Sequence, residues 1–453
     1  MRVLIVNANI VTGDGKTILQ NRSIIIENGL IESIRNTPCP IYDNASHIVD
    51  AAGGFVIPGL INHHTHCITR GPSPCDYALP GIPKARVIQN LNQHLLEGET
   101  TIVNQDGFVS TKELEEARSL TPMLLQTFSL QMPIHFKKAK VFSCGGLEEE
   151  HYKITIEDMV KKGVLGIGEV GAFGISRPPE GDNPDIKYID VEYVPFLVRN
   201  ETGHPISTEE AAALRLILFA DSYDDNKLTK LMLELNIIKA KEKLLQLKEN
   251  IMENAWLNIK ACDEAVSYAK KLKIPLDFHN TPQTWQQVIE FSQELGELFQ
   301  ATHSNFLYKP GKAIEVAREV KKVGGWVDIC TGNYFTSGQF FKNHATTMAL
   351  VSEGLADMIS TDYSGGYWDS ILRVLEYLID QNVIDLPRAI SMATKNVTEA
   401  IPNVAPNRGE IREGKVADLV VLDQRRISKV KTVLIGGKVV VDNGRIIQNF
   451  NEN

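Results

Sequence analysis

The sequence contains little that would direct the protein to a membrane, to nucleic acid or to the cell exterior. No apolar run approaches the about 18 residues that a helix needs to cross a bilayer. The opening stretch "MRVLIVNANIVTGDG" alternates like a β-strand and lacks the charged-then-apolar layout of a signal peptide. Basic residues are the minority, with 47 Lys and Arg against 56 Asp and Glu, and the net charge of −9 disfavours phosphate backbones as ligands. We therefore expect a cytoplasmic protein with no membrane or nucleic-acid partner.

Cysteine is also sparse, and no two cysteines form a close CxxC pair. This spacing favours free thiols in a reducing compartment over a disulfide framework. Hydrophobic residues make up 43% of the chain and charged residues 23%, as in an ordinary globular protein. The six cysteines are Cys39, Cys67, Cys75, Cys144, Cys262 and Cys330.

Both ends of the chain are rich in β-strand patterns. "RVLIVNANIVTGDG" and "RSIIIENGLIESI" near the start combine β-branched residues with Gly, Asn and Asp at the turns. "GKVADLVVLDQ" and "KVKTVLIGGKVVVDNGRII" near the end have the same composition. We expect residues 1–57 and 401–453 to pair into one small β-sandwich.

The middle of the chain, residues 58–400, alternates strand-like and helix-like segments. Eight strands interleaved with helices are the pattern of a parallel (β/α)8 barrel of the TIM type. The sequence therefore predicts an α/β protein with a barrel and a small β-sandwich built from both termini. The expected barrel strands are residues 59–66, 99–106, 130–136, 163–170, 274–280, 300–306, 325–330 and 356–362.

One connection in the barrel is abnormally long. The stretch between Glu169 and His279 far exceeds a usual βα loop of about two to six residues plus one helix. Its second half places Leu, Ile and Met at helical spacing with charged residues between them. We expect a helical insertion at about 175–255 above the barrel rim, which serves either for packing or as a lid or dimer contact.

Polar side chains end several of the expected strands. In "GLINHHTH", alternation points His64 and His66 to one side of the strand and His63 to the other, toward the helices. The carboxyl ends of barrel strands are where barrel enzymes place their catalytic groups. Four imidazoles and two carboxylates there suit two divalent ions, with zinc favoured and iron, manganese or nickel also compatible with these donors. The other four residues, each at the end of an apolar run, are Glu169, His279, His303 and Asp362.

The order of these motifs resembles the amidohydrolase superfamily. "PGLINHHTH" is followed by the strand-end Glu, His, His and Asp, and then by "RGEIREGKVADLVVLD". The resemblance covers nearly the whole chain apart from the insertion. Within the superfamily, "GIGEVGAFG", "DFHN", "THSN", "CTGN" and "STDYSGG" most resemble the enamidase-like members, which hydrolyse cyclic enamides.

This resemblance implies a set of ligands and a reaction. His64, His66 and Asp362 would bind one ion, His279 and His303 would bind the second, and Glu169 would bridge both, whereas many relatives bridge with a carboxylated lysine. Two ions that share a hydroxide would provide a nucleophile and polarise a carbonyl group. Asp362 could then carry a proton to the leaving nitrogen.

The implied activity is metal-dependent hydrolysis of a carbon–nitrogen bond other than a peptide bond, in a cyclic amide or a similar small amide. We expect a small-molecule substrate and a homo-oligomer. Two alternatives remain open: a deaminase that uses a single metal on the same scaffold, and a non-catalytic scaffold protein. The number of metals per chain would separate the hydrolase from the deaminase. Arg70, His135, Asn333 and Tyr363 are candidates for contact with the substrate.

Overall fold

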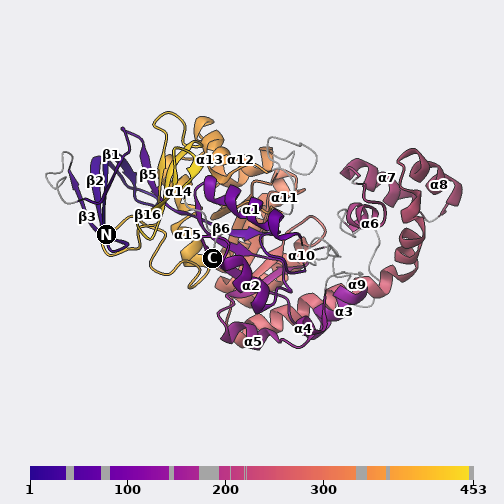
Figure 1. Ribbon diagram of the computed structural model, residues 1–453. Helices are drawn as coiled ribbons and strands as arrows, with labels where there is room; N and C mark the ends of the chain where they lie inside the picture. The colour runs from indigo at the N-terminus through magenta and orange to yellow at the C-terminus, as the bar shows by residue number, and fades with distance from the viewer. Residues whose placement is uncertain are drawn as a thin grey trace.

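The computed structural model describes most of the chain, and two β-sheets organise it (Figure 1). One sheet is built from both termini, and the other forms a barrel in the middle of the chain. The described residues are 1–36, 45–72, 82–141, 147–172, 193–204, 206–218, 220, 222–332, 344–363 and 368–447. Among the helices of these segments, none is long and apolar enough to cross a membrane.

The terminal sheet joins the two ends of the chain through one strand pair. β5 and β14 pair antiparallel, with Val56 opposite Val421. Ile5, Ile24 and Leu434 are fully buried in the core of this sheet. The expectation that the two termini combine is therefore confirmed. The sheet runs in the order β17-β16-β15-β14-β5-β1-β2-β3, with β4 paired to β1. Its strands are β1 Arg2–Val11, β2 Ile18–Glu27, β3 Leu30–Asn36, β4 His47–Asp50, β5 Phe55–Pro58, β14 Leu419–Leu422, β15 Val430–Ile435, β16 Lys438–Asp442 and β17 Arg445–Ile446.

The barrel contains eight strands, each paired with its neighbours in chain order. All of these pairs are parallel, and a bridge between Thr65 and Tyr363 brings the last strand back to the first. The predicted fold class is therefore confirmed. The strands are β6 Leu60–Thr65, β7 Glu99–Asn104, β8 Leu124–Ser129, β9 Gly166–Val170, β10 Leu276–His279, β11 Phe299–Thr302, β12 Trp326–Cys330 and β13 Met358–Ser360.

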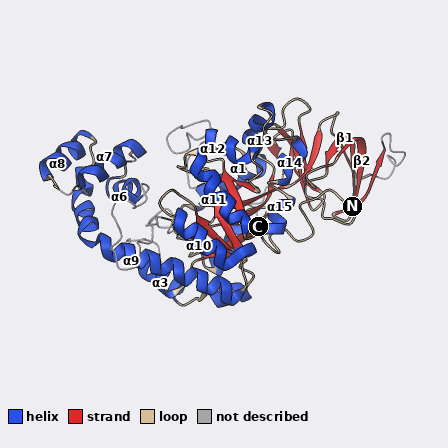
Figure 2. Ribbon diagram, turned by 180° about the vertical axis from the view of Figure 1, so that it is seen from behind, coloured by secondary structure: helices blue, strands red, loops and turns tan. Residues whose placement is uncertain are grey.

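Helices surround the barrel strands and bury their outer faces (Figure 2). The apolar side of α13 is typical, because Leu372, Leu375 and Leu378 recur at helical spacing and are all buried. These helices are α1 Lys84–Leu96, α2 Thr111–Arg118, α3 Pro133–Val141, α4 Glu149–Tyr152, α5 Ile156–Lys161, α10 Trp285–Leu295, α11 Pro310–Lys322, α12 His344–Ser352, α13 Ile371–Asp380, α14 Leu386–Ser391 and α15 Lys395–Ala400.

The prediction for the third barrel strand is wrong. Residues 130–136 were expected to form it, but the strand is β8 at Leu124–Ser129, and α3 begins at Pro133. Proline favours the first turn of a helix, because its fixed φ suits the helix and its missing N–H has no partner to lose there. Glu264 completes the start of α3 by accepting hydrogen bonds from the backbone N–H groups of Ile134 and His135. The other seven predicted strands overlap the observed ones.

A helical arm projects from the barrel between β9 and β10 (Figure 1). It has its own apolar core, in which Val198, Leu214, Met232 and Leu244 are buried. The last part of its longest helix instead packs on the barrel, where Ala265 belongs to the main core. One continuous helix therefore joins the arm to the strand that carries His279. The arm consists of α6 Tyr193–Thr202, α7 Thr208–Leu218, α8 Asp225–Glu234, the short helix η3 Ile238–Ala240 and α9 Lys241–Leu272.

Candidate metal centre

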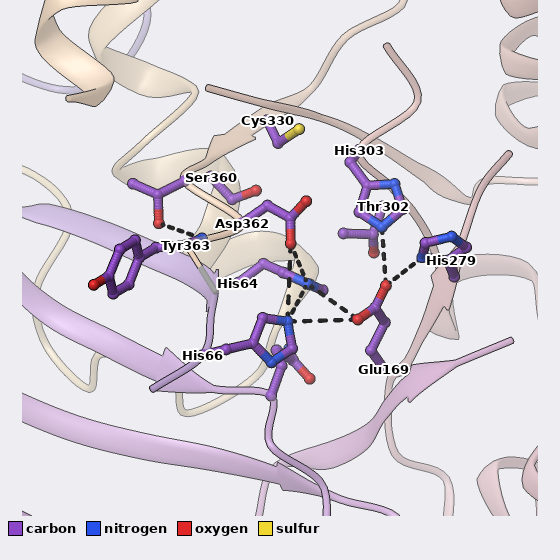
Figure 3. A network of polar contacts seen from close by, with 12 residues as sticks. His64, His66, Glu169, His279, Thr302, His303, Cys330, Ser360, Asp362 and Tyr363 are labelled. Carbon is purple, nitrogen blue, oxygen red and sulfur yellow. Dashed lines mark hydrogen bonds and ion pairs between the residues drawn. The ribbon is translucent and has the colours of Figure 1, made fainter. Parts of the chain in front are cut away.

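The six predicted ligands meet at one end of the barrel (Figure 3). Five of them are at most 5% exposed, whereas the Asp362 side chain is 19% exposed. They come from five strands or the residues that follow them directly, because parallel strands present their carboxyl ends on the same side of a barrel. The five least exposed residues are His64, His66, Glu169, His279 and His303.

Glu169 lies between two pairs of histidines. Its Oε2 is 3.8 Å from His64 Nε2 and 3.4 Å from His66 Nε2. Its Oε1 is 2.5 Å from His279 Nδ1 and 3.0 Å from His303 Nε2. The ligand atoms of each group of three lie within 4.8 Å of one another, so each group could hold a metal ion. Each carboxylate oxygen therefore faces one histidine pair.

Asp362 lies close to the first of these pairs. Its Oδ1 is 3.5 Å from His64 Nε2 and 3.8 Å from His66 Nε2. The backbone holds this carboxylate in place, because the Asp362 N–H donates to the His64 carbonyl and the His66 N–H donates to the Tyr363 carbonyl. Asp362 also has a left-handed φ of 51°, which turns the chain sharply after β13. The last strand thus directs a carboxylate back to the first strand.

The first histidine pair sits in a strongly negative environment. Burial opposes protonation of His64, but the charge and hydrogen bond of Asp277 raise its pKa to about 10. Burial likewise opposes protonation of His66, and the nearby carboxylates of Asp106 and Glu169 raise its pKa well above the usual value. Both shifts show that positive charge is stabilised between these rings.

The carboxylates show the complementary effect. Burial favours the neutral form of Glu169, but the charge and hydrogen bonds of His279 and His303 lower its pKa well below the usual value. Burial also favours neutral Asp362, and its hydrogen bond with His64 leaves the pKa lowered. The positive charge on the imidazoles and the negative charge on the carboxylates therefore offset each other inside the barrel. The donor set, imidazole plus carboxylate, fits a divalent cation that would take the place of the shared protons.

Two carboxylates behind the first histidine pair were not predicted from the sequence. Asp277 Oδ2 is 3.0 Å from His64 Nδ1, and Asp106 Oδ1 is 3.3 Å from His66 Nδ1. Both had a signal in the sequence. Asp277 lies two positions before His279 and so shares its face of the strand, and Asp106 directly follows the second strand in "TIVNQD".

The expectation that His63 faces the helices is wrong. Its Nε2 is 3.3 Å from Asp328 Oδ1, and both side chains are fully buried. Asp328 lies on the inner face of β12, because its neighbours Val327 and Ile329 belong to the core under the helices. The pairing of β6 with β7 is irregular between Asn62 and Thr65, which breaks the simple alternation of faces.

Three of the four other candidates for substrate contact have partners outside the predicted ligand set. His135 lies on α3, where its Nδ1 is 3.2 Å from Glu264 of α9. Arg70 is half exposed and pairs with a glutamate of α2 at 3.5 Å. The hydroxyl of Tyr363 donates to Asn90 at 2.9 Å, and its ring points away from Glu169 in Figure 3. Asn333 lies outside the described residues.

Comparisons with curated sequences support the family expected from the motifs. The amidohydrolase family profile matches residues 217–440. Enamidase from Eubacterium barkeri is 30% identical over 185 residues, which are 40% of this chain and 44% of that protein. An adenine deaminase from Ruegeria sp. (strain TM1040) is 25% identical over 162 residues, which are 35% of this chain and 25% of that protein. The matched region thus spans less than half the length of either relative.

Solved structures resemble this chain over nearly its whole length. A β-aspartyl dipeptidase from Fervidobacterium islandicum AW-1, solved with a β-Asp-Leu dipeptide, has a TM-score of 0.58 at 16% identity and covers 100% of this chain and 99% of its own. The crystal structure of enamidase has a TM-score of 0.54 at 18% identity, with 98% and 97% covered. At these identities the likeness concerns the fold alone. Residues 217–440 of this chain therefore match an amidohydrolase family domain, and the whole chain shares the fold of these solved structures.

Proposed function

We propose that this protein is a binuclear metal-dependent hydrolase that cleaves a carbon–nitrogen bond other than a peptide bond, in a cyclic amide or a similar small amide. The observation that carries the proposal is the position of Glu169. Its two oxygens are divided between two histidine pairs, as a carboxylate that bridges two ions requires. The similarity to enamidase supports this class of substrate.

The ligands divide into two groups around Glu169. His64, His66 and Asp362 would hold one ion, and His279 and His303 would hold the other. Zinc is the expected metal, and iron, manganese or nickel would suit the same donors. Two such ions supply a Lewis acid for the substrate carbonyl and lower the pKa of water, so that hydrolysis proceeds near neutral pH.

Asp362 is the residue that we expect to transfer protons. It is the most exposed of the six, so its carboxylate can reach a bound substrate. It accepts the proton of the attacking water and delivers it to the departing nitrogen, which leaves as a neutral amine or amide. The backbone hydrogen bonds at Asp362 and His66 keep this carboxylate at the mouth of the site.

Metal analysis and a substrate panel test the proposal. Protein purified without chelators should contain two metal ions per chain, and metal-loaded protein should hydrolyse a carbon–nitrogen bond in at least one member of a panel of cyclic imides, enamides, acyl amino acids and lactones. One ion per chain, with His279 and His303 unligated in a crystal structure, would refute the binuclear centre. We also expect a homo-oligomer in the cytoplasm that acts on a small molecule, and light scattering after gel filtration tests the assembly.

Deamination is the second candidate, because adenine deaminases are among the relatives. A deaminase removes an exocyclic amino group as ammonia and leaves the ring intact, whereas an amide hydrolase opens the ring or separates two products. Assays of ammonia release from aminopurines, run beside the cyclic amides, separate the two reactions. Ammonia release without turnover of any amide would favour the deaminase.

A further inference from the structure

The two histidine pairs around Glu169 differ in what lies behind them. In the first pair, the Nδ1 atoms of His64 and His66 each have a buried carboxylate nearby, at 3.0 and 3.3 Å. Of these two contacts, that of His64 is a hydrogen bond, whereas Nδ1 of His66 has none and meets Asp106 as a charge contact only. In the second pair, Nδ1 of His303 has no hydrogen-bond partner among the described residues. A carboxylate behind a metal-binding imidazole fixes the ring and makes it a stronger ligand. The two halves of the candidate centre are therefore not equivalent.

Of the two carboxylates, Asp277 makes the closer contact with its histidine. It is fully buried on β10. Its Oδ2 accepts a hydrogen bond from Gln105 Nε2 at 3.1 Å and lies 3.0 Å from His64 Nδ1, while its Oδ1 accepts a short hydrogen bond from the Thr302 hydroxyl. A carboxylate can only accept hydrogen bonds, so the proton of this contact belongs to His64 Nδ1. The lone pair of His64 Nε2 therefore faces Glu169.

The backbone of Gly168 packs closely against Asp277. Gly168 leaves no room beside it, because a Cβ atom at that position would lie 2.8 Å from the Asp277 Cβ and 2.6 Å from Gln105 Oε1. The carboxylate is thus enclosed by Gly168, Gln105, Thr302 and His64, which come from four different strands or strand ends. By contrast, the contact of Asp106 with His66 lacks the geometry of a hydrogen bond at Nδ1.

We propose that Asp277 is a positioning residue that sets the tautomer and orientation of His64, and thereby makes the group of His64, His66 and Asp362 the tighter of the two metal sites. Asp106 performs the same task for His66 with a smaller effect. This inference rests on the proposed metal centre. It adds that the two ions bind with different affinities and names the residue that causes the difference.

Cobalt titration of metal-free protein tests the proposal, with the absorption spectrum of bound Co²⁺ and calorimetry as readouts. The wild-type chain should bind two ions in succession. Asp277→Asn keeps the shape of the side chain but removes its charge, and should weaken the tighter site by about 10- to 100-fold while the second dissociation constant stays unchanged. Asp106→Asn should weaken the same site by a smaller factor.

Asp328→Asn is the matched control. Asp328 is an equally buried carboxylate of the barrel interior, but it accepts hydrogen bonds from Ser360 and from the backbone of His303 and contacts the ring of neither His64 nor His66. It should leave the tighter site and its cobalt spectrum unchanged. An equal loss of affinity in Asp328→Asn and Asp277→Asn would overturn the positioning role, because any buried carboxylate would then have the same effect.

The remaining outcomes separate this inference from the proposed function. If the wild-type chain binds two ions and Asp277→Asn binds them equally well, the inference is wrong and the metal centre stands. If the wild-type chain binds no ion, both are wrong. Should Asp277→Asn fail to fold, Thr302→Val removes only one hydroxyl donor to Asp277 and should weaken the tighter site by a smaller factor. An unchanged affinity in Thr302→Val would then count against the inference.

Discussion

The terminal sheet and the barrel interior bury their strands in opposite ways. Ile5 and Ile24 face each other across β1 and β2 in a core of aliphatic side chains. In β10, Leu276 and Phe278 pack under the helices, while Asp277 and His279 fill the inside of the barrel. Buried polar groups are tolerated only where they are paired, because an unpaired charge loses its hydration without compensation. The sheet therefore stabilises the fold, and the barrel interior concentrates charge for chemistry.

The largest effect is expected from a substitution that removes a charge from the barrel interior but keeps the shape of the side chain. We expect Asp362→Asn to lose about two to four orders of magnitude in kcat, because no other carboxylate of the centre is exposed enough to carry the proton. The variant should fold normally and keep most of its metal, since four imidazoles and Glu169 remain. Metal content measured beside kcat checks this, and a metal-loaded Asn variant with nearly wild-type kcat would remove Asp362 from the mechanism.

A substitution in the terminal sheet should have the opposite effect. Ile5→Ala deletes a fully buried side chain from the aliphatic core and should lower the free energy of unfolding by about 2–5 kcal/mol. The dissociation constants for metal should not change, because the sheet contributes no predicted ligand. Denaturant titration followed by circular dichroism measures the first quantity and cobalt titration the second. Loss of metal affinity in Ile5→Ala would show that the two regions are coupled.

Removal of the ions should affect the barrel more mildly. The raised pKa values of His64 and His66 show that the centre stabilises positive charge, which bound ions supply. Each ion present at a hundred times its dissociation constant stabilises the folded state by about 2.7 kcal/mol. Thermal unfolding with and without a chelator should therefore show a lower Tm in the chelated sample. Identical curves would mean that the buried charges balance one another without an ion.

The smallest expected effect concerns bicarbonate. A centre bridged by a carboxylated lysine needs carbon dioxide to assemble, whereas Glu169 brings its own carboxylate. Metal loading of the apo-protein should be the same with and without added bicarbonate. Metal content after dialysis in the two buffers measures this, and a crystal structure with a carboxylated lysine between the ions would contradict it.

Much of the fold and the approximate place of the site could be predicted from local patterns. Seven of the eight barrel strands overlap their predicted segments, and the six predicted ligands lie together at one end of the barrel, although their binding of metal remains a prediction. The third strand was misplaced because "LQMPIHF" is as apolar as a strand, and Pro133 was not interpreted as the start of a helix. Short apolar runs carry no periodicity that separates a strand from a buried helix.

The sequence by itself determined which polar residues end the barrel strands, because an apolar run followed by a histidine or carboxylate is visible in one dimension. Only the tertiary structure decided how those residues are supported. Asp277 and His64 are 213 positions apart in the chain, yet their side chains meet at 3.0 Å inside the barrel. His63 likewise turns inward because β6 pairs irregularly with β7. Alternation along one strand cannot reveal such contacts, since they depend on the register of neighbouring strands and on which side chains share the enclosed space.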